Sequence, residues 1–230
     1  MNITNSTNIN NKSTSFGFNI ETHLKVTEKA LSAIPNISKT DARYVARCSE
    51  LPDFKKMNML GWRNNGHFFY PNSKNKSFGY KANTKNNALN FFMNELEKIK
   101  SSKEKYERLL HVGCLIHFIQ DAQTPVHTEV GGSLKKLFDY KKHKEFERGK
   151  KYGMTSRLGI LEQNFEEIKV NFTSFADLFK QTALDSQSLK VKYTNKNKWL
   201  DIQQHCYNRA VAVTKALVSK LIKIYPDLFE

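Results

Sequence analysis

The chain has 230 residues, of which 37 are Lys or Arg and 22 are Asp or Glu, so its formal net charge is +15. We expect a single domain, because no linker rich in Pro, Gly or Ser divides the sequence internally. Hydrophobic residues make up 39% of the chain, which excludes a disordered protein. No apolar run approaches the roughly 18–20 residues that a membrane-spanning helix needs.

The first 15 residues are almost all Asn, Ser and Thr, and we expect this polar segment to be mobile. It has neither an apolar stretch nor a small-residue cleavage site, so it does not form a secretion signal. Two routes stay open: a natural leader that was removed and replaced by Met1, or delivery by another path. The folded domain is expected to cover residues 16–230.

From Phe16 onward the hydrophobic pattern is helical, and no Asn-Gly or Asp-Gly turn lies between alternating apolar runs. The sequence therefore predicts an all-α fold, a single-domain bundle of several helices. Ser38 can cap the second helix with its hydroxyl group, and Pro52 ends it. Residues 52–83 are rich in Gly, Pro and Asn and are predicted to be a functional loop. The predicted helices span about residues 19–33, 38–51, 84–100, 103–122, 133–150, 156–170, 172–189 and 197–223.

The most informative stretch runs from His111 to His127. His117 and Asp121 are four residues apart on a predicted helix, so an imidazole and a carboxylate share one face, as two ligands of one metal ion require. Pro125 ends this helix and His127 follows directly. His111 lies about 240° around the helix from His117 and is expected to be a packing or surface residue.

His143 and Glu147 repeat the same spacing of an imidazole and a carboxylate on a later predicted helix. Either pair alone is more often a surface salt bridge than a set of ligands, but His23, Asp53 and His67 add further candidates. The cysteines form no C-x-x-C motif that would suggest a thiolate site. Histidine and carboxylate ligands are typical of open, catalytic zinc sites. The sequence therefore predicts a polynuclear zinc site in a cleft of the bundle.

These residues resemble, in order and spacing, those of the zinc-dependent phospholipases C of bacteria. That family includes toxins and shares its all-α fold with zinc-dependent single-strand nucleases. The resemblance covers most of the chain. It rests on residues 18–24 with His23, on Leu51-Pro52-Asp53, on residues 67–71 beginning with His67, on His117, Asp121 and His127 with Gly113 before them, and on the closing pair His143 and Glu147.

The resemblance implies two to three zinc ions per chain, with Asp53 as an additional ligand or general base beside the first. The implied ligands are His67, His117 and Asp121 for the first ion, His127, His143 and Glu147 for the second, and His23 with a bridging Asp121 for the third. In the family an N-terminal tryptophan completes the third site. Here the first tryptophan is Trp62, so we expect that site to be incomplete, filled by another group or dependent on trimming.

The activity that the resemblance implies is a phospholipase C reaction, hydrolysis of the glycerol-side phosphodiester of phospholipids to diacylglycerol and a phosphorylated headgroup. Asp53 is the predicted catalytic residue because it can take the proton of an attacking water. We expect an exported monomer acting on a phospholipid membrane surface, the alternative to secretion being a delivered effector. The net charge suits anionic lipid and nucleic acid alike.

The positions that form a choline pocket in some family members correspond to Phe54 and Asn64 here, and these are the predicted substrate-binding residues. Since Asn64 is not aromatic, we do not assume that phosphatidylcholine is the substrate. Alternatives stay open: a nuclease of the same fold, with the aromatics of residues 62–80 as base platforms, and a non-catalytic, zinc-stapled basic binding module. The length of the gap between His127 and His143 favours the phospholipase over the nuclease, and so does Glu147 as the last ligand. Asp53 beside an open position of the predicted zinc site favours an enzyme over a binding module.

Overall fold

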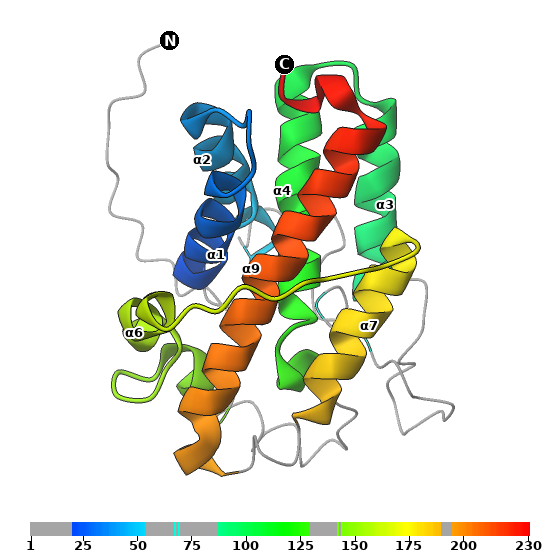
Figure 1. Cartoon of the computed structure of the whole chain (residues 1–230). Coiled ribbons are helices and arrows are strands. Elements are labelled where there is room, and N and C mark those ends of the chain that lie inside the picture. The colour runs from blue at the N-terminus through cyan, green and yellow to red at the C-terminus, as the bar shows by residue number, and fades with distance from the viewer. Residues whose placement is uncertain are drawn as a thin grey trace.

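The computed structural model describes residues 20–53, 67, 69, 87–128, 142, 144–189 and 195–230. This part of the chain contains helices and no strand, which confirms the all-α prediction (Figure 1). The α-helices are α1 (Ile20–Ser32), α2 (Lys39–Cys48), α3 (Ala88–Ser101), α4 (Lys105–Asp121), α6 (Leu158–Gln163), α7 (Phe175–Ser188) and α9 (Trp199–Ile224). Short 3-10 helices are η1 (Leu51–Asp53), η3 (Pro125–Thr128), η4 (Thr155–Arg157), η5 (Lys196–Lys198) and η6 (Pro226–Phe229).

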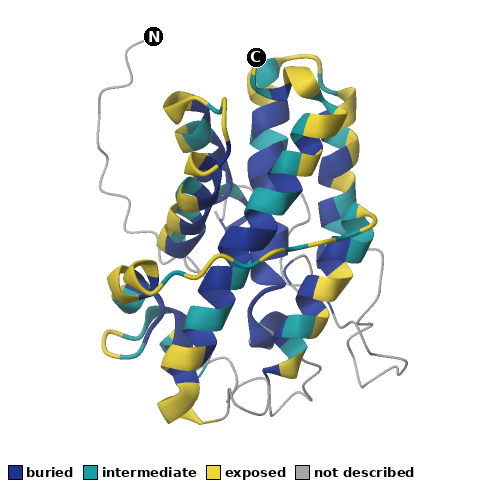
Figure 2. Ribbon diagram, in the orientation of Figure 1, coloured by how far each residue is buried: buried dark blue, intermediate teal, exposed yellow. Residues whose placement is uncertain are grey.

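Helix α4 lies at the centre of the bundle, between α2 on one side and α3 on the other, with α9 crossing it (Figure 1). Every residue from Val112 to Asp121 is buried (Figure 2). A helix that is covered on all sides belongs to the interior of a protein. His117 and Asp121, both on the buried half of α4, are therefore held in the middle of the molecule.

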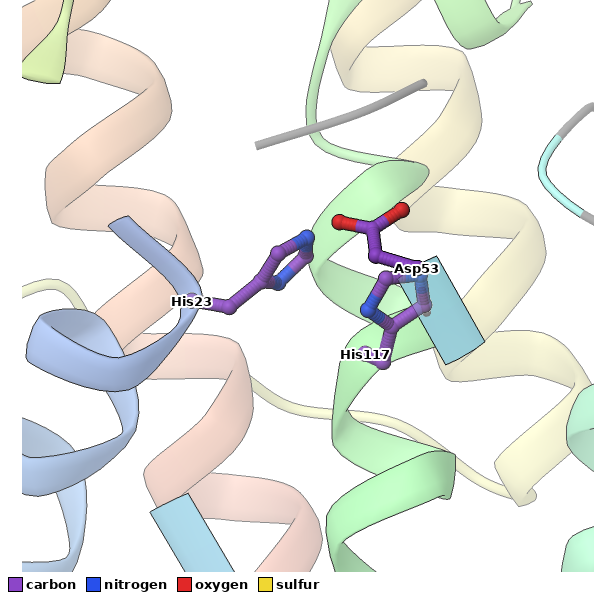
Figure 3. A group of neighbouring side chains, drawn as sticks. All are labelled: His23, Asp53 and His117. Atoms are coloured by element: carbon purple, nitrogen blue, oxygen red, sulfur yellow. The ribbon is translucent and has the colours of Figure 1, made fainter. Parts of the chain in front are cut away.

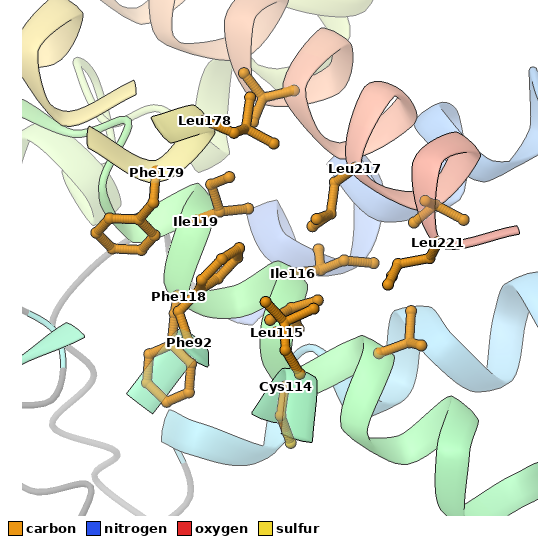
Figure 4. Packing of buried hydrophobic residues seen from close by; sticks show 14 of the residues in the cluster. Phe92, Cys114, Leu115, Ile116, Phe118, Ile119, Leu178, Phe179, Leu217 and Leu221 are labelled. Atoms are coloured by element: carbon orange, nitrogen blue, oxygen red, sulfur yellow. The ribbon is translucent and has the colours of Figure 1, made fainter. Parts of the chain in front are cut away.

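Buried hydrophobic side chains form two clusters, and α9 contributes to both. The first surrounds α4 and includes Phe92 of α3, Phe118 of α4, Phe179 of α7, and Leu217 and Leu221 of α9 (Figure 4). The second gathers around the N-terminal half of α9, with side chains from α1, α6 and the chain before α6, and contains Val26, Phe146, Met154, Leu161, Trp199 and Tyr207. Because one helix spans both clusters, the packing of α9 links the two halves of the described chain.

Two local features place α2 against α4. Ser38 caps α2 as predicted, because its hydroxyl accepts a hydrogen bond from the backbone N–H of Asp41 over 3.0 Å. Gly113 of α4 lies against the end of α2, where a Cβ atom would collide with the Cβ of Cys48 and would lie 2.7 Å from the carbonyl oxygen of Val45. The glycine therefore permits a close approach of the two helices.

The predicted helix over residues 156–170 is wrong in its second half. Helix α6 ends at Gln163, and residues 165–172 run without regular structure across α9 (Figure 1). Phe165 packs on the second hydrophobic cluster and Phe172 on the first. An extended chain covers about 3.3 Å per residue against about 1.5 Å in a helix, so the extended form lets one short segment reach both clusters.

Parts of the sequence-based description fall outside the described residues. These are the polar segment 1–15, most of the loop 52–83 and residues 133–141 of the predicted helix 133–150, whose residues 144–148 are helical. Among the helices that the structure describes, none is both long and apolar enough to cross a membrane.

Candidate metal centre

Side chains from α1, η1 and α4, together with His67, meet in a buried cluster between the helices. Figure 3 shows His23 of α1, Asp53 of η1 and His117 of α4 converging on one place. Ligand atoms of these three residues lie within 4.8 Å of one another, and the same holds for His67, His117 and Asp121. None of these side chains belongs to a residue more than 6% exposed. We call these five residues the buried acid–histidine cluster.

Asp121 is the hub of the cluster. Its Oδ2 atom lies 2.6 Å from Nδ1 of His67 and 3.2 Å from Nε2 of His117, and its Oδ1 atom lies 3.3 Å from Nε2 of His23. The nitrogens of His67 and His117 are themselves 3.1 Å apart. Imidazole nitrogens and a carboxylate so close together offer the ligand types that zinc binds.

Asp53 provides the test of whether a metal ion fits here. Both of its carboxylate oxygens are buried, and neither has a hydrogen-bond partner within the described part of the chain. A buried carboxylate without such partners is costly, because it has lost the hydrogen bonds that water would give it. A divalent cation held beside Asp53 by His117 and its neighbours in the cluster would supply the missing partner, so the residues fit a zinc ion.

The two carboxyl groups have opposite shifts in pKa. Burial raises the pKa of Asp53, and the neighbouring histidines reduce this rise without cancelling it. Burial also acts to raise the pKa of Asp121, but the charges of His117 and His127 and its hydrogen bonds to His117 and His23 hold it well below its usual range. Asp121 is therefore ionised near neutral pH, whereas Asp53 has an increased tendency to take up a proton.

The histidines differ in the same way. Burial acts to lower the pKa of His23 and of His67, but the hydrogen bond and charge of Asp121 outweigh it and raise both values. For His117 burial prevails and lowers the pKa. Burial also lowers the pKa of His127 to about 4, so this ring is neutral at physiological pH.

His127 of η3 lies beside the cluster. Its Nδ1 atom donates to the carbonyl oxygen of His67 over 2.6 Å, and the backbone N–H of Phe69 donates to the carbonyl oxygen of His127 over 3.0 Å. These reciprocal bonds tie the turn after α4 to the chain around His67. The His67 and His127 rings have centroids 6.4 Å apart.

Comparison with known protein families and with curated proteins finds no match to the chain. Comparison with solved structures does. The alpha-toxin of Clostridium absonum matches 91% of this chain with a TM-score of 0.61 and 15% sequence identity. The Clostridium perfringens alpha-toxin from avian strain SWCP matches 93% of it with a TM-score of 0.54 and 14% identity.

The chain shares the all-α fold of these alpha-toxins. At this level of identity the likeness establishes the fold and nothing finer. The chain spans 66% of the length of each toxin structure.

Other predicted site residues lie only partly within the described structure. Glu147 is buried, and its carbonyl oxygen accepts a hydrogen bond from the hydroxyl of Thr155 over 3.0 Å. That hydroxyl lies 3.4 Å from the hydroxyl of Thr22, the residue before His23. His143, Phe54 and Asn64 fall outside the described residues, so the second zinc site and the headgroup pocket stay predictions.

The structure also shows polar residues that the sequence analysis did not single out. Nδ1 of His23 lies 2.7 Å from Oε1 of Gln120, and Nδ1 of His117 donates to the carbonyl oxygen of Ser49 over 2.9 Å. The available signal was Gln120 itself, a polar residue within the apolar part of α4. His111 lies apart from the cluster and pairs with Glu95 over 2.7 Å.

Proposed function

We propose that the protein is a zinc-dependent phospholipase C that hydrolyses the glycerol-side phosphodiester of phospholipids. The observation that carries the proposal is the buried carboxylate of Asp53, which has no hydrogen-bond partner within the described chain and lies beside His23 and His117. A zinc ion used only as a structural staple would not need such an acid beside it. The ordered motifs of the sequence and the alpha-toxin-like fold agree with this assignment.

In this proposal His67, His117 and Asp121 hold the first zinc ion, and His127, His143 and Glu147 hold the second. Bound zinc supplies Lewis-acid activation of water and of the phosphoryl oxygens. Sequence resemblance and the position of His23 near Asp121 support a third site, so that two to three ions bind in total.

The protein's own groups divide the remaining work. Asp121 lies within 3.3 Å of nitrogens of three imidazole rings and so gathers His23, His67 and His117 around one carboxylate. Asp53 accepts a proton from the attacking water at a carboxylate oxygen and can pass it on to the leaving alkoxide. Burial of the cluster strengthens each of these electrostatic interactions, since little water screens them.

The partner of the enzyme is then a phospholipid membrane surface, and the enzyme acts as a monomer. The positive net charge would attract the protein to anionic headgroups. Action on such a surface further implies export from the cell that makes the protein, by a leader or as a delivered effector.

Phosphorus NMR tests the proposal directly. The zinc-loaded protein is incubated with mixed phospholipid vesicles and a single-stranded oligonucleotide, beside a chelated control. Release of headgroup phosphomonoesters in the zinc-loaded sample alone is the expected result and also identifies the headgroup. Release of nucleotides alone would contradict the phospholipase assignment and support a nuclease of the same fold. No release from zinc-loaded protein, tested both with its full N-terminus and after trimming of residues 1–15, would favour the binding module.

A further inference from the structure

A chain of hydrogen-bonded polar groups runs behind His23, on the side of the ring away from Asp121. It connects the end of α2 with α1, α4 and α9. The hydrogen-bonded series consists of five residues whose side chains are all fully buried: Ser49, Thr27, Gln120, Thr214 and His23. Because no member is exposed to water, the polar groups of these side chains must find their hydrogen-bond partners within the protein.

The direction of these hydrogen bonds is fixed at the α2 end. The hydroxyl of Ser49 donates to the backbone carbonyl of Ala46 over 2.7 Å, and a carbonyl oxygen can only accept. Ser49 has thereby used its one proton, so it can only accept from the hydroxyl of Thr27, 3.3 Å away. Thr27 in turn has used its own proton and must accept from its next neighbour, which is Gln120.

This direction sets the orientation of the Gln120 side-chain amide. Its Nε2 group donates to the hydroxyl oxygens of Thr27 and Thr214, each over 3.1 Å. Its Oε1 atom is therefore the end that faces His23, and Nδ1 of His23, 2.7 Å away, must carry a proton to donate. In the neutral ring the lone pair is then on Nε2, the nitrogen that lies 3.3 Å from Oδ1 of Asp121.

The same end of α2 also forms a hydrogen bond with the ring of His117. The backbone carbonyl of Ser49 accepts from Nδ1 of His117, so that ring also presents Nε2 to the buried acid–histidine cluster. The His23 and His117 rings are stacked with their centroids 4.2 Å apart. Hydrogen bonds to Nδ1 thus hold both the His23 and the His117 ring in the tautomer that carries its proton on Nδ1.

We propose that Gln120 is a positioning residue, which fixes the tautomer of His23 so that Nε2 can bind a divalent metal ion. This inference rests on the proposed metal centre, but it does not depend on which phosphodiester is cleaved. Partners of this kind behind a metal-bound histidine fix its orientation, and removing one lowers metal affinity by roughly 10–100-fold.

The direct test is long-range 1H–15N NMR of the metal-free protein with 15N-labelled histidine, recorded at a pH where the rings are neutral. The expected spectrum shows the His23 proton on Nδ1. In Gln120→Leu both His23 tautomers should be populated, and zinc affinity, measured by competition with a chromophoric chelator, should fall by roughly 10–100-fold. Gln123→Leu is the matched control, because Gln123 is buried on the same turn but donates to Asp185.

If Gln120→Leu does not fold, the double variant Thr27→Val with Thr214→Val removes both hydroxyl groups that accept from the amide and should produce the same mixture of tautomers. A His23 proton on Nε2 in the wild-type protein would overturn the inference. So would an unchanged tautomer and zinc affinity in the folded Gln120 variant or in the folded double variant. A wild-type protein with the expected tautomer and Gln120-dependent zinc affinity, but without phospholipase activity, would support this inference and reject the proposed function alone.

Discussion

The backbone carbonyl oxygen of Ser49 accepts a hydrogen bond from Nδ1 of His117 over 2.9 Å, and this contact joins the end of α2 to the face of α4 that carries His117 and Asp121. It requires the two helices to lie close together, which they do at Gly113, one turn before His117. The absent side chain at Gly113 leaves room for Cys48 and for the Val45 carbonyl. A packing feature of the core therefore controls the orientation of the His117 ring.

Gly113→Ala should destabilise the protein and weaken zinc binding together. The added methyl group must push α2 away, and overpacking of this kind costs about 1–3 kcal/mol. Urea unfolding measures the change in stability, and chelator competition measures the change in zinc affinity.

Gly159→Ala is the matched control, since a Cβ atom there would meet nothing within 4 Å. This substitution in α6 should raise stability by about 0.5–1 kcal/mol and leave zinc affinity unchanged. Equal stability changes in the two variants would contradict the role given to Gly113.

Asp53→Asn should lower turnover far more than it lowers substrate binding, because the amide cannot accept the proton of water. Loss of a general base lowers turnover by about 10²–10⁴-fold. Steady-state kinetics on phospholipid vesicles separates the two effects, with zinc content measured on the same samples. Asp41→Asn changes another buried carboxylate, one that accepts a hydrogen bond from the hydroxyl of Ser38 at the start of α2, and should retain turnover. Near-normal turnover of the Asp53 variant would remove this residue from the mechanism.

Removal of zinc should lower the melting temperature of the wild-type protein. A ligand that binds only the folded state stabilises it by about 2.7 kcal/mol when its free concentration is 100 times Kd. Calorimetry with chelator, and again after zinc is restored, measures the shift. Asp121→Asn should show a smaller zinc-dependent shift than wild type, since the hub of the cluster is lost while the proposed site of His127, His143 and Glu147 remains. A shift as large as that of wild type would place all of the bound zinc outside the cluster.

Asp185 of α7 gives a pH dependence outside the buried acid–histidine cluster. Burial acts to raise its pKa, but the hydrogen bond and charge of His205 and the charge of Arg209, both on α9, lower it. A carboxyl group with a lowered pKa stabilises the folded state above its unfolded pKa of about 3.9, and the contribution disappears as pH falls through the folded value. Asp185→Asn should therefore be less stable than wild type at neutral pH, and the two should converge below about pH 3.9. Urea unfolding across this range would reject the assignment if the difference stayed constant.

The sequence predicted those features that depend on local spacing. His117 and Asp121 lie on one face of a helix because they are four residues apart, and the structure places them together. Asp53 and His67 have no such spacing to either residue, and only the order of motifs in a known family linked them to α4. The structure brings both into the same cluster. Their roles as ligands stay a prediction.

The sequence could not predict contacts between separate helices. Helical periodicity shows which face of α4 carries Gln120, but it does not show that this face meets Thr27 of α1 and Thr214 of α9. For the same reason the sequence wrongly predicted that the helix continues past residue 165. Residues 165–172 are not helical, because Phe165 and Phe172 pack on two different clusters.

Anomalous diffraction at the zinc absorption edge, from crystals of gently purified protein, tests most directly whether the buried acid–histidine cluster is a metal centre. The account predicts an anomalous peak at about 2.0–2.2 Å from ligand atoms of His67, His117 and Asp121. A protein that contains zinc but shows no peak at these residues, or one that binds less than one zinc ion per chain, would contradict it.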